Sequence, residues 1–144
     1  MAISASLQIV NQIAAGPNNE GTSITLTSIS QVNDDSTWSV PENGTVLQAN
    51  GAPANLAMGN SSVFIAPKGC GANVNFSYNY LQGGQIYTQT GQIYLEIPAV
   101  GEHTLWGHTL PAPAGNPVPA NKIPDFNFAI TNTGGNSYKV TVSL

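Results

Sequence analysis

The side chains best suited to chemistry in this sequence are one cysteine and two histidines, Cys70, His103 and His108. A nucleophilic thiol needs an oriented base beside it, and the sequence KGCG at 68–71 carries no signature of such a pair. The pattern favours Cys70 as a small buried thiol at the end of a strand. We therefore expect no enzymatic activity; the alternative is a Cys70–histidine dyad formed across the fold.

The histidines could also bind a metal ion together with acidic residues. His103 and His108 are five positions apart, which places them on opposite faces of a strand, so both could reach one ion only from a loop. The acidic turn at Asn33–Asp35 lacks the ligand spacing of calcium loops. The seven acidic residues are scattered among turns, and no pair stands out as the carboxylates of a glycosidase. We expect no metal and no cofactor.

Four aromatic side chains suit recognition better than catalysis: Tyr87, Tyr94, Trp38 and Trp106. Tyr87 and Tyr94 are out of phase with the neighbouring aliphatic residues and are flanked by glutamines. An exposed tyrosine among amides suits a sugar, a lipid headgroup or another protein, because the ring stacks while the phenol and amides form hydrogen bonds. Both tryptophans lie near turns, as interfacial anchors do. These four are the candidate ligand-binding residues; the alternative is that a second sheet or a subunit covers the tyrosines and that the tryptophans are partly buried.

The elements that position these residues are organised around the segment Ala72–Pro98. Apolar and polar residues alternate from Asn73 to Tyr80, which predicts a strand with one buried and one solvated face. The glycine pair Gly83-Gly84 then predicts a turn.

A short repeat follows this turn, because GQIY occurs at 84–87 and again at 91–94. In one unbroken strand, the odd spacing would place Ile86 and Ile93 on opposite faces. A turn centred on Gln89-Thr90 would instead pair the two isoleucines across a hairpin. We favour the hairpin, with Gly91 adding a bulge, and this arrangement places Tyr87 and Tyr94 on the same outer face.

The rest of the chain shows strand signals separated by turns, and no window has helical periodicity. We expect Gln48–Ser62 to be a long loop with a short extended piece near Met58. Pro111–Pro124 holds five prolines and is expected to be an extended surface loop. Further strands are predicted at Ile3–Ile9, Ile24–Ile29 with a bulge or a strand end near Ile29, Trp38–Val40, Val46–Leu47, Val63–Ile65, Gln92–Ile97, Thr104–Trp106, Phe126–Ile130 and Tyr138–Leu144.

These signals predict an all-β fold, a single antiparallel β-sandwich of about 8–10 short strands, with a jelly-roll-like arrangement as the alternative. The length of 144 residues suits one domain, spanning 1–144. Alternation up to Leu144 predicts that the C-terminus is part of a sheet.

Charged residues make up only 7% of the chain, and the net charge is −4; a typical globular chain has about 25% charged residues. Three lysines and no arginine are present, so we expect no binding to nucleic acid and no strong attraction to anionic lipid. Edge strands are usually protected by lysines. Their scarcity predicts a homo-oligomer or an ordered assembly.

The N-terminal residues lack the basic and apolar regions of a signal peptide, and no apolar window is long enough for a membrane helix. We expect cytoplasmic synthesis, with release by lysis or non-classical secretion as the alternative to retention. Cys70 is the only cysteine, so no disulfide can form within the chain.

The chain resembles the aegerolysins, small acidic β-sandwich cytolysins without a signal peptide. The shared features are size, an N-terminal strand pair (LQIVNQ and SITLTSIS), a middle rich in glycine and asparagine, and a closing hairpin. The resemblance implies a non-enzymatic protein that recognises a membrane lipid together with a pore-forming partner. We therefore expect a lipid- or glycan-binding protein, either a cytolysin component or a lectin-like module. The alternative is a self-assembling coat, filament or inclusion subunit.

Overall fold

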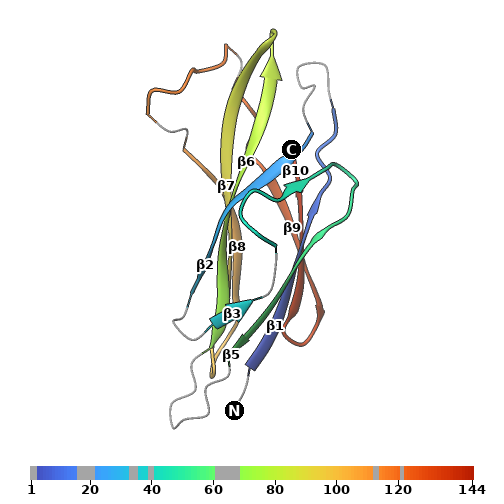
Figure 1. Cartoon of the computed structure of the whole chain (residues 1–144), viewed down its shortest axis with the longest axis vertical. Helices are drawn as coiled ribbons and strands as arrows, with labels where there is room; N and C mark the ends of the chain where they lie inside the picture. The colour runs from blue at the N-terminus through green and yellow to red at the C-terminus, as the bar shows by residue number, and fades with distance from the viewer. Residues whose placement is uncertain are drawn as a thin grey trace.

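The computed structural model describes residues 3–15, 22–32, 36–38, 41–60, 69–111, 114–120 and 122–144. These residues form two five-stranded sheets that pack face to face, and they contain no helix (Figure 1). The predicted all-β sandwich is confirmed. None of the described elements is a helix that could cross a membrane.

The two sheets differ in how their strands are connected. The first has the order β3-β5-β1-β10-β9, formed by β3 (Ser36–Trp38), β5 (Ala54–Asn60), β1 (Ile3–Asn11), β10 (Ser137–Ser143) and β9 (Asn127–Gly134). The second has the order β4-β2-β6-β7-β8, formed by β4 (Val46–Leu47), β2 (Ile24–Gln31), β6 (Cys70–Gln82), β7 (Gln85–Ile97) and β8 (Thr104–Leu110). The first and last strands pair in parallel, whereas the other described pairs are antiparallel.

The core lies between the sheets and follows the alternation of the sequence. Val74, Phe76 and Tyr78 of β6 are fully buried and pack in one cluster with Leu7 and Ile9 of β1. Alternate residues point inward on each strand, so burial of apolar side chains fixes both the strand and its register. The predicted C-terminal strand is also confirmed, since β10 pairs with both β1 and β9.

The predicted second hairpin within the central segment is wrong. β7 runs unbroken from Gln85 to Ile97 and pairs with β6 residue by residue from Cys70 to Gln82. The turn at Gly83-Gly84 is confirmed, and both glycines have positive φ (59° and 76°). Because β7 is continuous, Tyr87 and Tyr94 lie on opposite faces of the sheet. Gly91 forms no bulge in this pair; it lies opposite Phe76.

The segment predicted as a loop from Gln48 to Ser62 contains a seven-residue strand, β5. Its inward residues Ala54, Leu56 and Met58 are buried, but small neighbours hide the alternation in the sequence. The bulge predicted in β2 is confirmed near Leu26 and Ser28. The predicted strand at 63–65 and the acidic residues at 33–35 lie outside the described residues.

Candidate functional site

The structure does not bring the four predicted ligand-binding residues together. Tyr94 and Trp106 meet on the outer face of the second sheet. Tyr87 lines a cleft on the opposite, inward-facing side of β7. Trp38 ends β3 in the other sheet, and its side chain lies outside the described part of the structure.

Tyr94 and Trp106 form an aromatic pair across neighbouring strands. They are directly opposite each other in the β7–β8 register, and their rings stack with centroids 5.0 Å apart and planes within 8°. His108, two residues along β8, places its ring 4.5 Å from Trp106 at 41°. Each ring covers one face of the other, so the main role of the pair is packing on the outer face of the sheet.

The phenol of Tyr94 is fixed by a carboxylate on the same strand. Its hydroxyl donates a hydrogen bond of 2.8 Å to Oε2 of Glu96. Burial raises the pKa of Tyr94, and the hydrogen bond to Glu96 and the charge of Glu96 raise it further. Tyr94 therefore stays protonated at neutral pH and acts as a hydrogen-bond donor.

Amides continue this outer face across the sheet towards β2. Gln92 donates through Nε2 to Oδ1 of Asn73 at 2.7 Å, and Asn75 donates through Nδ2 to Oγ of Ser28 at 2.9 Å. Each bond occupies one donor of an amide, but the buried Oδ1 of Asn75 has no partner in the described structure.

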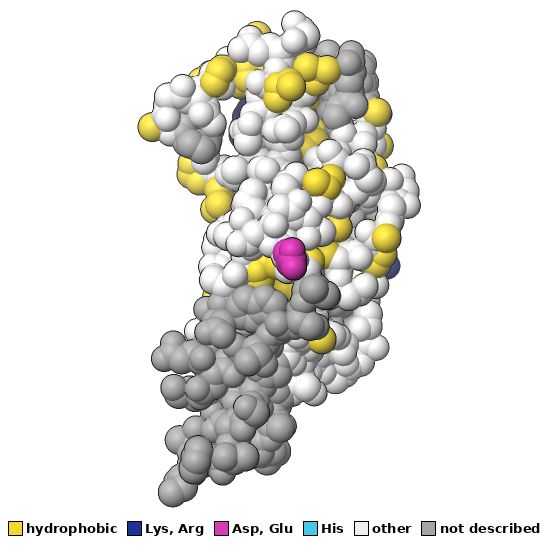
Figure 2. Space-filling model, viewed as in Figure 1, with side chains coloured by type: hydrophobic (Ala, Val, Ile, Leu, Met, Phe, Trp, Pro, Cys, Tyr) yellow, Lys and Arg dark blue, Asp and Glu magenta, His cyan; other side chains and the backbone are white. Residues whose placement is uncertain are grey.

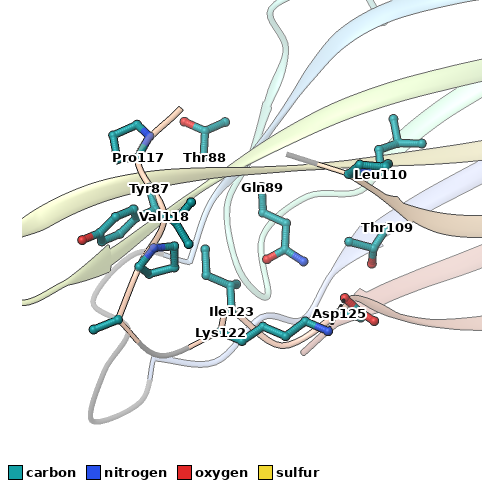
Figure 3. Close-up of a pocket in the computed structure, with 13 residues that line it drawn as sticks. Tyr87, Thr88, Gln89, Thr109, Leu110, Pro117, Val118, Lys122, Ile123 and Asp125 are labelled. Atoms are coloured by element: carbon teal, nitrogen blue, oxygen red, sulfur yellow. Dashed lines mark ion pairs between the residues drawn. The ribbon is translucent and has the colours of Figure 1, made fainter. Parts of the chain in front are cut away.

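A separate cleft lies between the second sheet and the proline-rich segment, residues 111–124 (Figure 3). It has a volume of about 600 Å³, within the range of ligand-binding cavities. Its walls come from β7, the end of β8 and the segment that leads to β9. They are formed by Tyr87, Thr88, Gln89, Thr109, Leu110, Pro111, Pro117, Val118, Pro119, Ala120, Lys122, Ile123 and Asp125.

Two hydrogen bonds hold the proline-rich segment against the sheet. Nε2 of Gln89 donates to the carbonyl oxygen of Pro124 at 3.0 Å, and the backbone N–H of Phe126 donates to Oγ1 of Thr109 at 2.8 Å. Phe126 then packs its ring 5.0 Å from that of Phe76 in the core. These bonds fix the C-terminal end of the segment to the sheet at the cleft.

Gln89 is the most unusual residue of the cleft. Only 8% of its surface is exposed, and Figure 3 shows its side chain pointing from β7 towards Ile123 and Lys122. Its Nε2 has the partner described above, but in the described structure its buried Oε1 has none. A buried acceptor without a partner costs about 1–3 kcal/mol, so this oxygen is the polar atom of the cleft that would gain most from a hydrogen-bond donor.

The residues considered for catalysis do not gather in this cleft. Cys70 is fully buried at the start of β6, and burial raises the pKa of its thiol, which makes it a poor nucleophile. His103 hydrogen-bonds with the hydroxyl of Tyr138, whereas His108 lies against Trp106. In the described part of the chain, no three His, Cys, Asp or Glu side chains come together as a metal site.

Sequence reasoning missed Gln89 and the role of the proline-rich segment in the cleft. The available signal was the alternation of residues along β7. In an unbroken strand, Gln89 lies on the same face as Gly91 and Ile93. A glutamine in a core-facing phase is unusual, but the expected turn at Gln89-Thr90 removed that signal.

Comparisons with protein-family models, with curated proteins and with solved structures found no match.

Proposed function

We propose that this protein is a non-enzymatic binding protein that docks on membrane lipid through the end carrying the β6–β7 turn and the proline-rich segment. The supporting observation is the exposure of apolar side chains at this end. Ile86, near the turn, is 60% exposed, and Val118 of the proline-rich segment is 84% exposed. Val118 shares the cleft lining with Tyr87, the residue after Ile86, so both apolar side chains belong to one end of the molecule.

Figure 2 shows several hydrophobic side chains on the surface of this end, and others elsewhere on the visible face. Apolar side chains on a projecting tip gain free energy by entering the boundary between headgroups and acyl chains. Tyr87 lies beside them, and an aromatic ring with a polar hydroxyl suits the same boundary.

Charge supports contact with neutral lipid. The chain has a net charge of −4, and Lys122 near the cleft lies 4.0 Å from Asp125. The described residues of the tip therefore offer no cluster of free cations for anionic headgroups. The aegerolysin-like organisation of the sequence points to the same class of target. Glycan binding is the competing outcome of the test below.

The test is co-sedimentation with phosphatidylcholine vesicles, with and without cholesterol and sphingomyelin. Ile86→Ser combined with Val118→Ser should weaken vesicle binding at least about tenfold, because each buried aliphatic side chain is worth about 1.5–3 kcal/mol. Val100→Ser is the matched control: Val100 is 91% exposed, but it follows the other end of β7.

Unchanged vesicle binding by the double variant would contradict docking through this end. Absence of vesicle binding by the wild-type protein, combined with binding to a glycan array, would replace lipid with glycan as the target.

The second candidate function is self-assembly as a structural subunit. It is favoured by the two long edge strands, β8 and β9, whose sequences contain no charged residue and no proline. They lie at the same side of the sandwich, because the ring of Phe128 in β9 lies against Gly107 of β8. Such edges are available for pairing with another copy.

A further inference from the structure

We propose that the cleft between β7, β8 and the proline-rich segment binds a small neutral amphiphile that donates one hydrogen bond, from a hydroxyl or an amide N–H, to Oε1 of Gln89. This site goes beyond membrane docking, because it is formed by the folded chain alone and needs no bilayer.

The first step of the argument is the state of Gln89. More than nine-tenths of its surface is buried, and its amide cannot rotate freely, because Nε2 is held by the carbonyl oxygen of Pro124. This contact also fixes the orientation of the amide, because exchanging Oε1 and Nε2 would set one carbonyl-type oxygen against another. Oε1 therefore remains an acceptor without a partner in the described structure, and only a donor can satisfy it.

The second step is the character of the walls. Leu110, Ile123, Val118 and the ring of Tyr87 line the cleft together with prolines. Apolar walls around one oriented acceptor are the usual arrangement of a small-molecule site. A mainly apolar ligand with a single donor fills such a site better than a polyol, whose other hydroxyls would lose their hydrogen bonds to water.

The third step is charge. The charged residues that line the cleft are Lys122 and Asp125, which lie 4.0 Å apart with their side chains 83% and 67% exposed. They lie close enough to offset each other, and both side chains are largely exposed to solvent. A charged ligand would lose its hydration without gaining a partner inside, so the ligand is neutral.

The test uses two probes of nearly equal shape, 1-octanol and its methyl ether 1-methoxyoctane, of which only the alcohol carries a donor. Each is titrated into the full chain and followed by amide chemical shifts in two-dimensional NMR. We expect shifts at the amides of 87–89 and 109–110 and at the non-proline residues between 118 and 125. Octanol should bind about tenfold tighter than the ether, since satisfying a buried acceptor is worth about 1–3 kcal/mol.

The Gln89→Met variant keeps the length of the side chain but removes the acceptor, so the two probes should bind within about twofold of each other. Gln92→Met is the matched control on the outer face of the same strand, and it should keep the preference for octanol. Because the alcohol-to-ether ratio is measured first on the wild-type protein, the proposal stays testable even if Gln89→Met fails to fold. Equal binding of both probes to the wild-type protein, or shifts confined to other regions, would overturn the site.

The donor could come from a membrane lipid or from a free amphiphile, and vesicle binding by Gln89→Met separates the two sources. Weaker vesicle binding assigns the site to a lipid hydroxyl or amide, whereas unchanged vesicle binding with a lost octanol preference assigns it to a free ligand. The variant that combines Ile86→Ser with Val118→Ser tests membrane docking separately from the cleft site. If this variant loses vesicle binding but still binds octanol, the two proposals concern different sites.

Discussion

Gly91 shows how one missing side chain shapes the core. It lies opposite Phe76 on the neighbouring strand, and a Cβ at this position would come within 2.3 Å of Cζ of the Phe76 ring. Gly107 has the same relation to Phe128, whose Cγ lies 2.3 Å from the position of such a Cβ. Both glycines lie within strands, where they allow an aromatic ring to approach the backbone closely. The sequence presents Gly91 as a bulge signal, because its partner ring lies on another strand.

Gly91→Ala should lower the free energy of unfolding by about 1–3 kcal/mol, because the added methyl group overpacks the core at Phe76. Urea denaturation measures this change. Phe76→Leu makes room at the same place, so the cost of Gly91→Ala should be smaller in the Phe76→Leu background than in the wild type. Equal costs in both backgrounds would show that the ring of Phe76 is not what excludes the methyl group.

Tyr94 should make stability depend on alkaline pH. Its pKa in the folded protein is raised above the ordinary value of 10.0, first by burial and then by Glu96. Above about pH 10 the unfolded chain therefore binds fewer protons than the folded chain, and the free energy of unfolding falls as the pH rises. This contribution is fully present below the unfolded pKa and is lost as the pH rises through the folded one.

Tyr94→Phe removes this titration, so the stability of the wild type relative to Tyr94→Phe should decline as the pH rises above about 10. Glu96→Gln should lower the pKa of Tyr94, which tyrosinate absorbance in the ultraviolet reports. A stability difference between wild type and Tyr94→Phe that is constant with pH would contradict the assignment.

At the scale of elements, the β6–β7 hairpin decides where the candidate sites lie. Alternation in β6 predicted its strand and its buried face correctly. The GQIY repeat was misleading, because local similarity cannot show whether the chain turns between its copies or continues. Thirteen consecutive residue pairs join β7 to β6, so β7 continues without a turn past Gln89. Tyr87 and Tyr94 therefore lie on opposite faces of the sheet.

The two-residue turn of this hairpin should tolerate only particular residues. Both Gly83 and Gly84 have positive φ, which suits the Asn-Gly sequence of type I′ turns. Gly83→Asn should therefore change the melting temperature little, whereas Gly84→Val should cost about 1–2 kcal/mol or more, because a branched side chain is strained there. Thermal unfolding followed by circular dichroism compares them, and equal melting temperatures would argue against this turn geometry.

At the scale of the whole molecule, the scarcity of charge leaves β8 and β9 without the lysines that usually protect an edge. The other edges are short: β3 has three residues and β4 has two. Association through an edge would therefore use the side of the sandwich formed by β8 and β9.

Size-exclusion chromatography with light scattering should show a mass that increases with protein concentration. Ala129→Lys places a charge on an exposed position of edge strand β9 and should reduce this association. Ala57→Lys is the matched control, because Ala57 is exposed on β5, a strand that is paired on both sides. A monomer at every concentration, or equal effects of the two lysines, would exclude assembly through β9.

The sequence by itself determined the all-β class, the buried faces of β1, β6 and β10 and the closing hairpin, because alternation of apolar and polar residues is a local property with a period of two. It also identified Tyr87, Tyr94 and Trp106 as aromatic residues outside the main core pattern.

Only the tertiary structure decided what these residues touch, because contacts between distant segments leave no local pattern. Asn11 donates to the carbonyl oxygens of Thr22 and Leu47 and accepts from the N–H of Ile13, and nothing near it in the sequence predicts the two longer connections. The orphaned oxygen of Gln89 arises in the same way. It becomes a candidate binding group only when the proline-rich segment, about thirty residues later in the chain, folds back against the sheet and removes it from water.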